Sequence, residues 1–121
     1  MPIRKILIVD DSPTERHVLH DMLTKAGYEV VASDSGEDAV VKARVAKPDL
    51  ILMDVVMPGL NGFQATRAIS RDPDTRTIPI ILCTSKSQET DKIWGMRQGA
   101  RDYIVKPVDR DELLAKISAV A

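Results

Sequence analysis

Short apolar runs alternate along the chain with longer stretches whose apolar residues recur every three or four positions. The short runs suit strands buried on both faces, and the longer spacing predicts amphipathic helices. Strict alternation of strand and helix implies a parallel sheet covered by helices on both sides. We therefore predict an α/β fold with a doubly wound, five-stranded parallel sheet. The strands are expected at residues 6–9, 28–32, 50–53, 80–83 and 103–105.

Capping residues indicate where the helices begin. Ser12 suits the N-cap of the first helix, and Glu15 is expected to complete a capping box with it. Asp109 and Glu112 form a similar start pattern for the last helix. The helix expected at 89–97 contains Gly95, which costs about 1 kcal/mol relative to Ala inside a helix. We expect that helix to be the least stable of the five.

Composition excludes several classes of protein. The 121 residues suffice for one domain, so we expect a single domain over residues 1–121 and no output domain. A formal net charge of -1 argues against nucleic acid as the main partner. The apolar runs are too short to span a membrane, and the start of the chain predicts a strand rather than a signal peptide. The lone Cys83 suits a reducing cytoplasm, where we expect the protein to reside.

Polar residues follow four of the predicted strands at the point where each strand ends. Asp10 and Asp11 follow the first strand, Asp54 the third, Thr84 the fourth and Lys106 the fifth. Parallel strands end at one edge of the sheet, and open α/β folds bind their ligands there. Carboxylates with no His or Cys suit Mg²⁺, and an added ammonium and hydroxyl suit a phosphoryl group. The sequence thus predicts a Mg²⁺ and phosphoryl site.

These residues, in this order at the strand ends, resemble a response-regulator receiver domain along essentially the whole chain. The narrower resemblance is to the single-domain regulators of twitching-motility chemosensory systems, through the segments GFQATR, IWGMRQGARDY and KPVD. The motifs that match the family are the pair Asp10 and Asp11, the segment MDVVMPGLNG with Asp54, then Thr84, Tyr103, and Lys106 with Pro107.

The resemblance implies a flavodoxin-like (CheY-like) fold with strand order 2-1-3-4-5. Asp54 would accept a phosphoryl group from a sensor histidine kinase of the chemotaxis type. Mg²⁺ would be bound by Asp11, Asp54 and the backbone carbonyl of Val56, with Asp10 helping directly or through water. The expected partners are that kinase and a downstream motility protein, with no nucleic acid and no membrane, and the chain is expected to be monomeric.

The resemblance also implies how the site responds. Lys106 would pair with the phosphoryl oxygens, and its bond to Pro107 would be cis. Thr84 would move to hydrogen-bond the phosphoryl group, and Tyr103 would turn inward behind it. Whether the signal passes to a partner, or the chain drains phosphoryl groups from a shared kinase, stays open.

Other functions and structural roles compete with this interpretation. Taken singly, each strand-end residue could be an ordinary helix-start acid, loop residue or solvated lysine. A Mg²⁺-dependent phosphohydrolase could use Asp54 as nucleophile, but such enzymes commonly place a second Asp two residues on, where this chain has Val56. A small nucleotide-binding protein is disfavoured because the chain lacks both glycine-rich phosphate-binding motifs.

Overall fold

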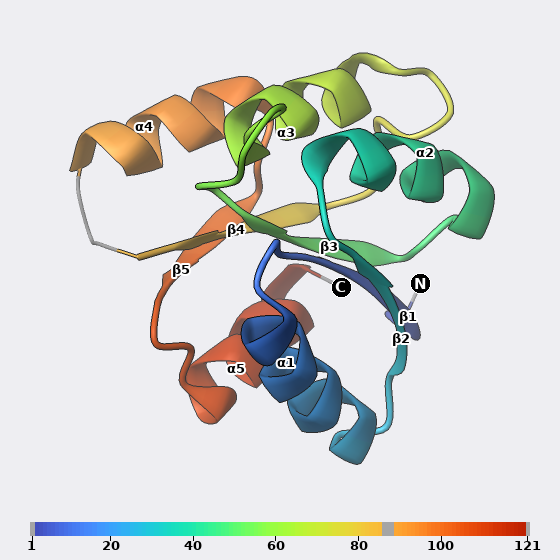
Figure 1. The fold of residues 1–121 in the computed structure, drawn as a ribbon. Coiled ribbons are helices and arrows are strands. Elements are labelled where there is room, and N and C mark those ends of the chain that lie inside the picture. The colour runs from blue at the N-terminus through green and yellow to red at the C-terminus, as the bar shows by residue number, and fades with distance from the viewer. Residues whose placement is uncertain (1, 86–88, 121) are drawn as a thin grey trace.

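The computed structural model describes residues 2–85 and 89–120. Within these residues five strands alternate with five helices (Figure 1). All strand pairs are parallel, and the strand order is β2-β1-β3-β4-β5, which confirms the predicted fold class. The elements are β1 (Lys5–Val9), α1 (Pro13–Lys25), β2 (Glu29–Ser33), α2 (Gly36–Ala46), β3 (Leu50–Asp54), α3 (Gly62–Arg71), β4 (Ile80–Thr84), α4 (Glu89–Gln98), β5 (Asp102–Val105) and α5 (Arg110–Val120).

Helices cover both faces of the sheet: α1 and α5 lie on one side, and α2, α3 and α4 lie on the other (Figure 1). Successive residues of a strand point to opposite faces, so each central strand contributes to two cores. Leu7, Ile51 and Leu82 belong to one buried cluster. Their sequence neighbours Ile6 and Leu52 belong to the other. The apolar runs are therefore continuous because both faces of these strands are buried.

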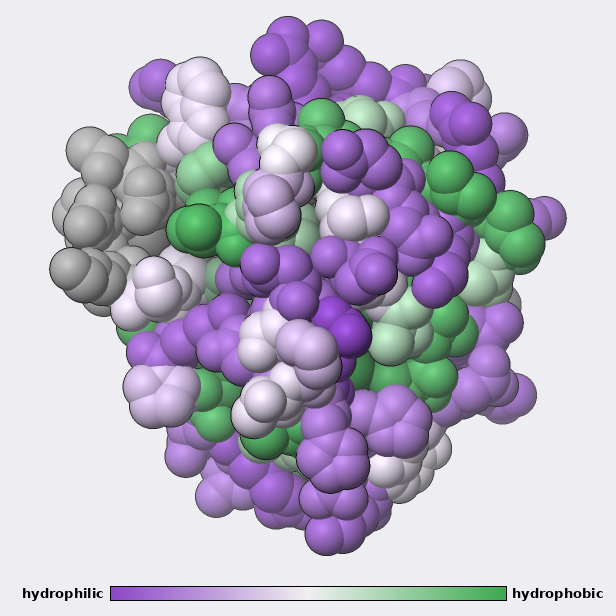
Figure 2. Space-filling model, viewed as in Figure 1, coloured by the Kyte–Doolittle hydropathy of each residue, from purple (hydrophilic) through white to green (hydrophobic). Residues whose placement is uncertain are grey.

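The two ends of the strand order are less buried than its centre. All five residues of β3 and of β4 are buried, whereas β2 is exposed at Glu29 and half-buried over the next three residues. The more polar composition of β2 fits its position at one end of the strand order. Figure 2 shows a mainly hydrophilic surface on the side viewed, with an apolar area over α2, the helix that exposes Val41 and Val45. No helix in the described ranges is both long and apolar enough to cross a membrane.

Side chains cap the N-termini of three helices, and two of these caps, Ser12 and Asp109, are predicted from the sequence. The Ser12 hydroxyl accepts a hydrogen bond from the backbone N–H of Glu15 at 3.3 Å, and the Asp109 carboxylate accepts one from Glu112 at 2.9 Å. Ser35 caps α2 in the same way. These bonds satisfy backbone donors that have no partner within the helix.

The predicted capping box at Ser12 is wrong in one half. The Ser12 N–H donates to Asp10 Oδ1 at 2.9 Å, where a capping box would have used the Glu15 side chain. A full capping box instead starts α3, where Asn61 and Gln64 exchange side chain to backbone bonds. The Glu15 carboxylate is therefore available to accept a hydrogen bond from another donor.

Two glycines permit close packing around the carboxyl edge of the sheet. A Cβ on Gly62 would lie 2.1 Å from the Asp54 carbonyl oxygen and 2.8 Å from Val55 Cα. A Cβ on Gly95 would lie 2.2 Å from Leu82 Cδ1. Gly95 does not interrupt α4, which runs continuously through it, so this glycine has a packing role.

We predict that Gly62→Ala lowers the free energy of unfolding by about 1–3 kcal/mol, the usual cost of overpacking. The added methyl group meets backbone atoms, which cannot rotate away as a side chain could. Chemical denaturation measures the change. Ala68→Gly, at an exposed position of the same helix, is the control and should cost about 1 kcal/mol through helix propensity alone. A Gly62→Ala protein as stable as the wild type would contradict this packing.

Candidate functional site

The carboxyl ends of β1, β3 and β5 bring three charged side chains into contact. Lys106 Nζ donates to Asp10 Oδ2 at 3.0 Å and to Asp54 Oδ1 at 2.9 Å. Asp10 and Asp54 are almost fully buried, and the Lys106 side chain is largely buried. The expectation that these strand ends meet in one crevice is therefore confirmed.

Asp11 completes a group of three carboxylates. One carboxylate oxygen from each of Asp10, Asp11 and Asp54 lies within 4.8 Å of the other two. Asp11 is exposed, so the crevice opens to solvent on its side. Three hard oxygen donors this close together, in a group without His or Cys, fit Mg²⁺ better than zinc.

Val56 lies in the loop that follows Asp54. The residue is 72% exposed, while its neighbours Val55 and Met57 are buried. Val55 fixes the loop, because its N–H donates to the Cys83 carbonyl at 3.2 Å and its carbonyl accepts from Gly62 at 2.9 Å. The backbone carbonyl of Val56 stays a predicted metal ligand beside the carboxylates.

Thr84 is the last residue of β4 and is buried. Asp54 pairs with Cys83 in the sheet register, so Thr84 is one residue beyond the level of Asp54 on the neighbouring strand. The Lys106 N–H donates to the Thr84 carbonyl at 2.6 Å, which joins the ends of β4 and β5. The structure thus brings Thr84 to the same edge as the charged residues.

Tyr103 lies one strand further out, at the edge of the sheet. It pairs with Leu82 in the register between β4 and β5 and is half-buried against the core on the side of α2, α3 and α4. Lys116 Nζ lies 5.3 Å from the centre of its ring, within the range of a cation–π contact. Tyr103 is therefore behind the crevice rather than in it. The predicted cis peptide bond between Lys106 and Pro107 is present.

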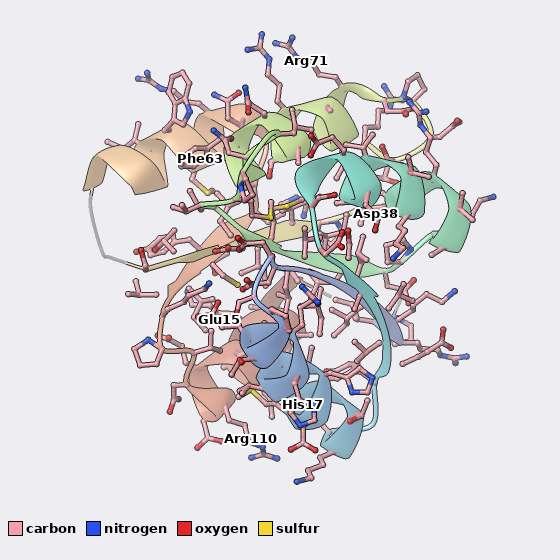
Figure 3. All side chains as sticks on the ribbon, in the orientation of Figure 1. Glu15, His17, Asp38, Phe63, Arg71 and Arg110 are labelled. Atoms are coloured by element: carbon pink, nitrogen blue, oxygen red, sulfur yellow. The ribbon has the colours of Figure 1, made fainter. Side chains whose placement is uncertain are left out.

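Glu15 is the site residue that sequence reasoning missed. Its carboxylate accepts a hydrogen bond from Lys106 Nζ, the same ammonium that contacts Asp10 and Asp54. Glu15 lies at the start of α1, on the side facing the chain that follows β5 (Figure 3). A signal was present, because an acid in the first turn of the helix after the Asp10 and Asp11 pair must lie over the same sheet edge.

Burial is the largest cause of the pKa shifts of the two buried carboxylates, Asp10 and Asp54. Removal from water raises the pKa of Asp54, and the charges of Asp10 and Asp11 add to this, while the hydrogen bond from Lys106 opposes it. The pKa of Asp10 is also raised, first by burial and then by a side-chain hydrogen bond with Glu15.

The pKa values of Glu15 and Lys106 shift in the directions that favour their charged forms. The pKa of Glu15 is lowered by its side-chain hydrogen bonds with Asp10 and with Lys106. Burial tends to lower the pKa of Lys106, but its hydrogen bonds to Glu15, Asp54 and Asp10 outweigh burial and raise it. The ammonium therefore stays charged beside an excess of carboxylates, and a cation would relieve that excess.

Comparison with known proteins identifies the family. The sequence model of one protein family, the response regulator receiver domain, matches residues 6–118. The chain belongs to the response regulator receiver family. Receiver domains take phosphoryl groups from histidine kinases in two-component signalling, and they bind Mg²⁺ at an acidic pocket of this kind.

Curated relatives include proteins of the same length and longer ones. The receiver chain is 60% identical to protein PilH of Pseudomonas aeruginosa over 116 residues, which covers 96% of both chains. It is 42% identical to the phosphate regulon transcriptional regulatory protein PhoB of the same species, over 97% of this chain and 51% of PhoB. The match to PilH thus extends over nearly all of that protein.

Solved structures agree with the fold. The chemotaxis protein CheY4 of Vibrio cholerae superposes with a TM-score of 0.93 at 34% identity, covering 98% of this chain and 99% of that one. The receiver domain of sensor histidine kinase PA1611 from Pseudomonas aeruginosa gives 0.89 at 35% identity, covering 96% and 95%. Its structure has a magnesium ion coordinated in the active site cleft.

The raised pKa of Asp54 predicts a pH-dependent stability. The native state holds this proton more tightly than the unfolded state, so ionised Asp54 reduces stability above its folded pKa, and the loss disappears as pH falls through that pKa. We predict that Asp54→Asn is more stable than the wild type at neutral pH without Mg²⁺. The gain should shrink as the solution is acidified, which thermal unfolding across the acid range measures.

Asp74→Asn serves as the control, because Asp74 is exposed on the loop after α3 and lies outside the three-carboxylate group. It should leave the pH profile of stability unchanged. An Asp54→Asn protein less stable than the wild type at neutral pH, or one whose advantage is constant with pH, would show that burial of this charge is not costly.

Proposed function

We propose that this receiver domain accepts a phosphoryl group on Asp54 from a histidine kinase in a Mg²⁺-dependent reaction. The observation that carries the proposal is the contact of one buried ammonium, Lys106, with buried Asp54, inside a group of three carboxylates. A carboxylate oxygen of Asp54 forms a bond to phosphorus as the bond from phosphorus to the imidazole nitrogen of phosphohistidine breaks. The imidazole leaves with the electron pair of that bond.

Asp10, Asp11 and Asp54, with the backbone carbonyl of Val56, would hold the Mg²⁺. When bound, the ion supplies positive charge against the phosphoryl oxygens and offsets the repulsion among the carboxylates. The crevice opens on the exposed side of Asp11, which leaves room for the donor to approach Asp54.

Lys106 would stabilise the phosphorylated state. Its ammonium already donates to Asp54 Oδ1, so a phosphoryl group on Asp54 would lie within its reach. A charge-assisted hydrogen bond of this kind is roughly twice as strong as a neutral one. The residues of this chain thus position and neutralise the phosphoryl group, which is most of what phosphoryl transfer requires.

Thr84 and Tyr103 would transmit a conformational change from the phosphorylated site to the surface of the protein. Thr84 would move its hydroxyl toward the phosphoryl group, and Tyr103 would turn inward behind it. Support comes from their positions, since Thr84 ends the strand next to Asp54 and Tyr103 pairs with β4 from the edge. We propose that α4, β5 and α5 form the surface that responds. Trp94, the single tryptophan of the chain, is 49% exposed on α4 and can report the change.

The similarity to PilH suggests the process served. We propose that the protein acts in chemotaxis-like control of type IV pilus twitching motility, with a chemotaxis-type histidine kinase as its donor. The support is the 60% identity over nearly the whole of both chains and the segments GFQATR and IWGMRQGARDY. The output is a motility protein that binds the phosphorylated form, or a draining of phosphoryl groups from that kinase.

We predict that the wild type accepts phosphoryl from its kinase only with Mg²⁺ and that Asp54→Asn does not. Asparagine keeps the shape but has no nucleophilic carboxylate. Phosphotransfer from radiolabelled kinase measures this. In parallel, Mg²⁺ with beryllofluoride, an unreactive phosphoryl mimic, should change Trp94 emission in the wild type, less in Thr84→Ala and not at all in Asp54→Asn.

Lys106→Ala is the control that separates metal binding from phosphoryl binding. It should keep Mg²⁺ binding, because Lys106 is not a proposed ligand, yet respond weakly to beryllofluoride. Transfer to Asp54→Asn at the wild-type rate would refute the assignment of Asp54. An emission spectrum that stays fixed while calorimetry detects beryllofluoride binding would refute the proposed response at α4.

A further inference from the structure

Lys106 is fully engaged before any phosphoryl group arrives. An ammonium has three N–H donors, and here they meet three carboxylates, those of Asp10, Glu15 and Asp54. A phosphoryl group on Asp54 can therefore gain a hydrogen bond from Lys106 only if one of the three partners yields. The identity of that partner decides how readily the site accepts an anion.

The three partners differ in position. The side chains of Asp10 and Asp54 are 1% and 8% exposed, whereas that of Glu15 is 45% exposed. Asp10 and Asp54 also belong to the three-carboxylate group proposed to hold Mg²⁺, and Glu15 does not. Glu15 is thus the partner of Lys106 that would not hold the metal, and its other contact is a side-chain hydrogen bond with Asp10.

Space beside this contact allows Glu15 to move. A cavity of about 210 Å³ lies between α1 and the chain after β5, with Glu15 and Lys106 in its lining beside apolar residues such as Val18 and Val108. Figure 3 shows Glu15 on this side of α1. Since the Glu15 side chain is partly in solvent, water can replace Lys106 as its partner. The two buried carboxylates would instead become unpaired buried charges if they lost Lys106.

We propose that Glu15 is a positioning residue that holds Lys106 in the unphosphorylated state and competes with the phosphoryl group for its ammonium. This inference rests on the proposed function, because it needs Asp54 to be the phosphoacceptor. It assigns to Glu15 a control over how strongly the site binds an anion. The same negative charge should favour Mg²⁺, so its removal should affect the two ligands in opposite directions.

Calorimetric titration tests this, first with Mg²⁺ alone and then with beryllofluoride at saturating Mg²⁺. In Glu15→Gln, beryllofluoride should bind about three- to tenfold more tightly, the effect expected from removing one charge that is a few ångströms from an anion and largely screened by water. Mg²⁺ should bind somewhat more weakly. Glu15→Asp, which restores the charge, should return both affinities toward those of the wild type.

Glu29→Gln is the matched control, since Glu29 is an exposed acid at the amino end of β2, opposite the crevice. It should change neither affinity. Unchanged or weaker beryllofluoride binding in Glu15→Gln overturns the proposal. Glu15→Asp behaving like Glu15→Gln overturns it too, because charge would not be the cause.

The same titrations separate this inference from the proposed function. A wild type that binds beryllofluoride no better than Asp54→Asn refutes the phosphoacceptor assignment and the role of Glu15 together. A wild type that binds it through Asp54, with no change in Glu15→Gln, refutes only the role of Glu15.

Discussion

The ammonium of Lys106 joins parts of the chain that are far apart in sequence. It donates to Asp10, to Glu15 and to Asp54, at separations of 96, 91 and 52 residues. Ions taken out of water lose hydration, so such a contact persists only where the geometry is good and each ion has partners. The ammonium meets these conditions, but Asp11 adds a fourth carboxylate beside Asp10 and Asp54. That excess of negative charge favours a bound cation, which the proposed phosphoryl group would need.

The fold keeps this strained group in place through its buried centre. Asp54 ends a strand whose five residues are all buried, and its backbone is packed against Gly62 of α3 with no space for a methyl group. The ends of β4 and β5 are joined by the bond from the Lys106 N–H to the Thr84 carbonyl. The side chains of the proposed site therefore lie at the ends of rigid strands. The Glu15 side chain on α1 is instead partly exposed to solvent.

The sequence predicted the features that depend on local patterns. Apolar runs and alternation predicted the doubly wound sheet, and the residue after each run predicted the members of the site, because parallel strands end at one edge. Strand order came from the family resemblance, since periodicity does not specify which strands pair. Predicted strand limits were close; β1, for example, begins at Lys5 rather than Ile6.

The failures involve groups whose partners are distant in sequence. Glu15 fits a capping box by spacing, but a lysine 91 residues away competes for its carboxylate, and Asp10 takes the Ser12 N–H in its place. Here tertiary contacts outweigh the local preference that the sequence displays. Gly95 also has a packing role that the sequence did not show, because its lack of a side chain lets α4 approach Leu82, and the low stability expected of this helix stays a prediction.

We infer that the excess carboxylate charge around Lys106 must be offset by a bound cation before the site can take a phosphoryl group. Calorimetric titration with beryllofluoride, with and without Mg²⁺, measures the coupling between the two directly. We expect strong positive coupling, so that each ligand tightens the binding of the other by the same factor. Beryllofluoride that binds equally well without Mg²⁺ would contradict it.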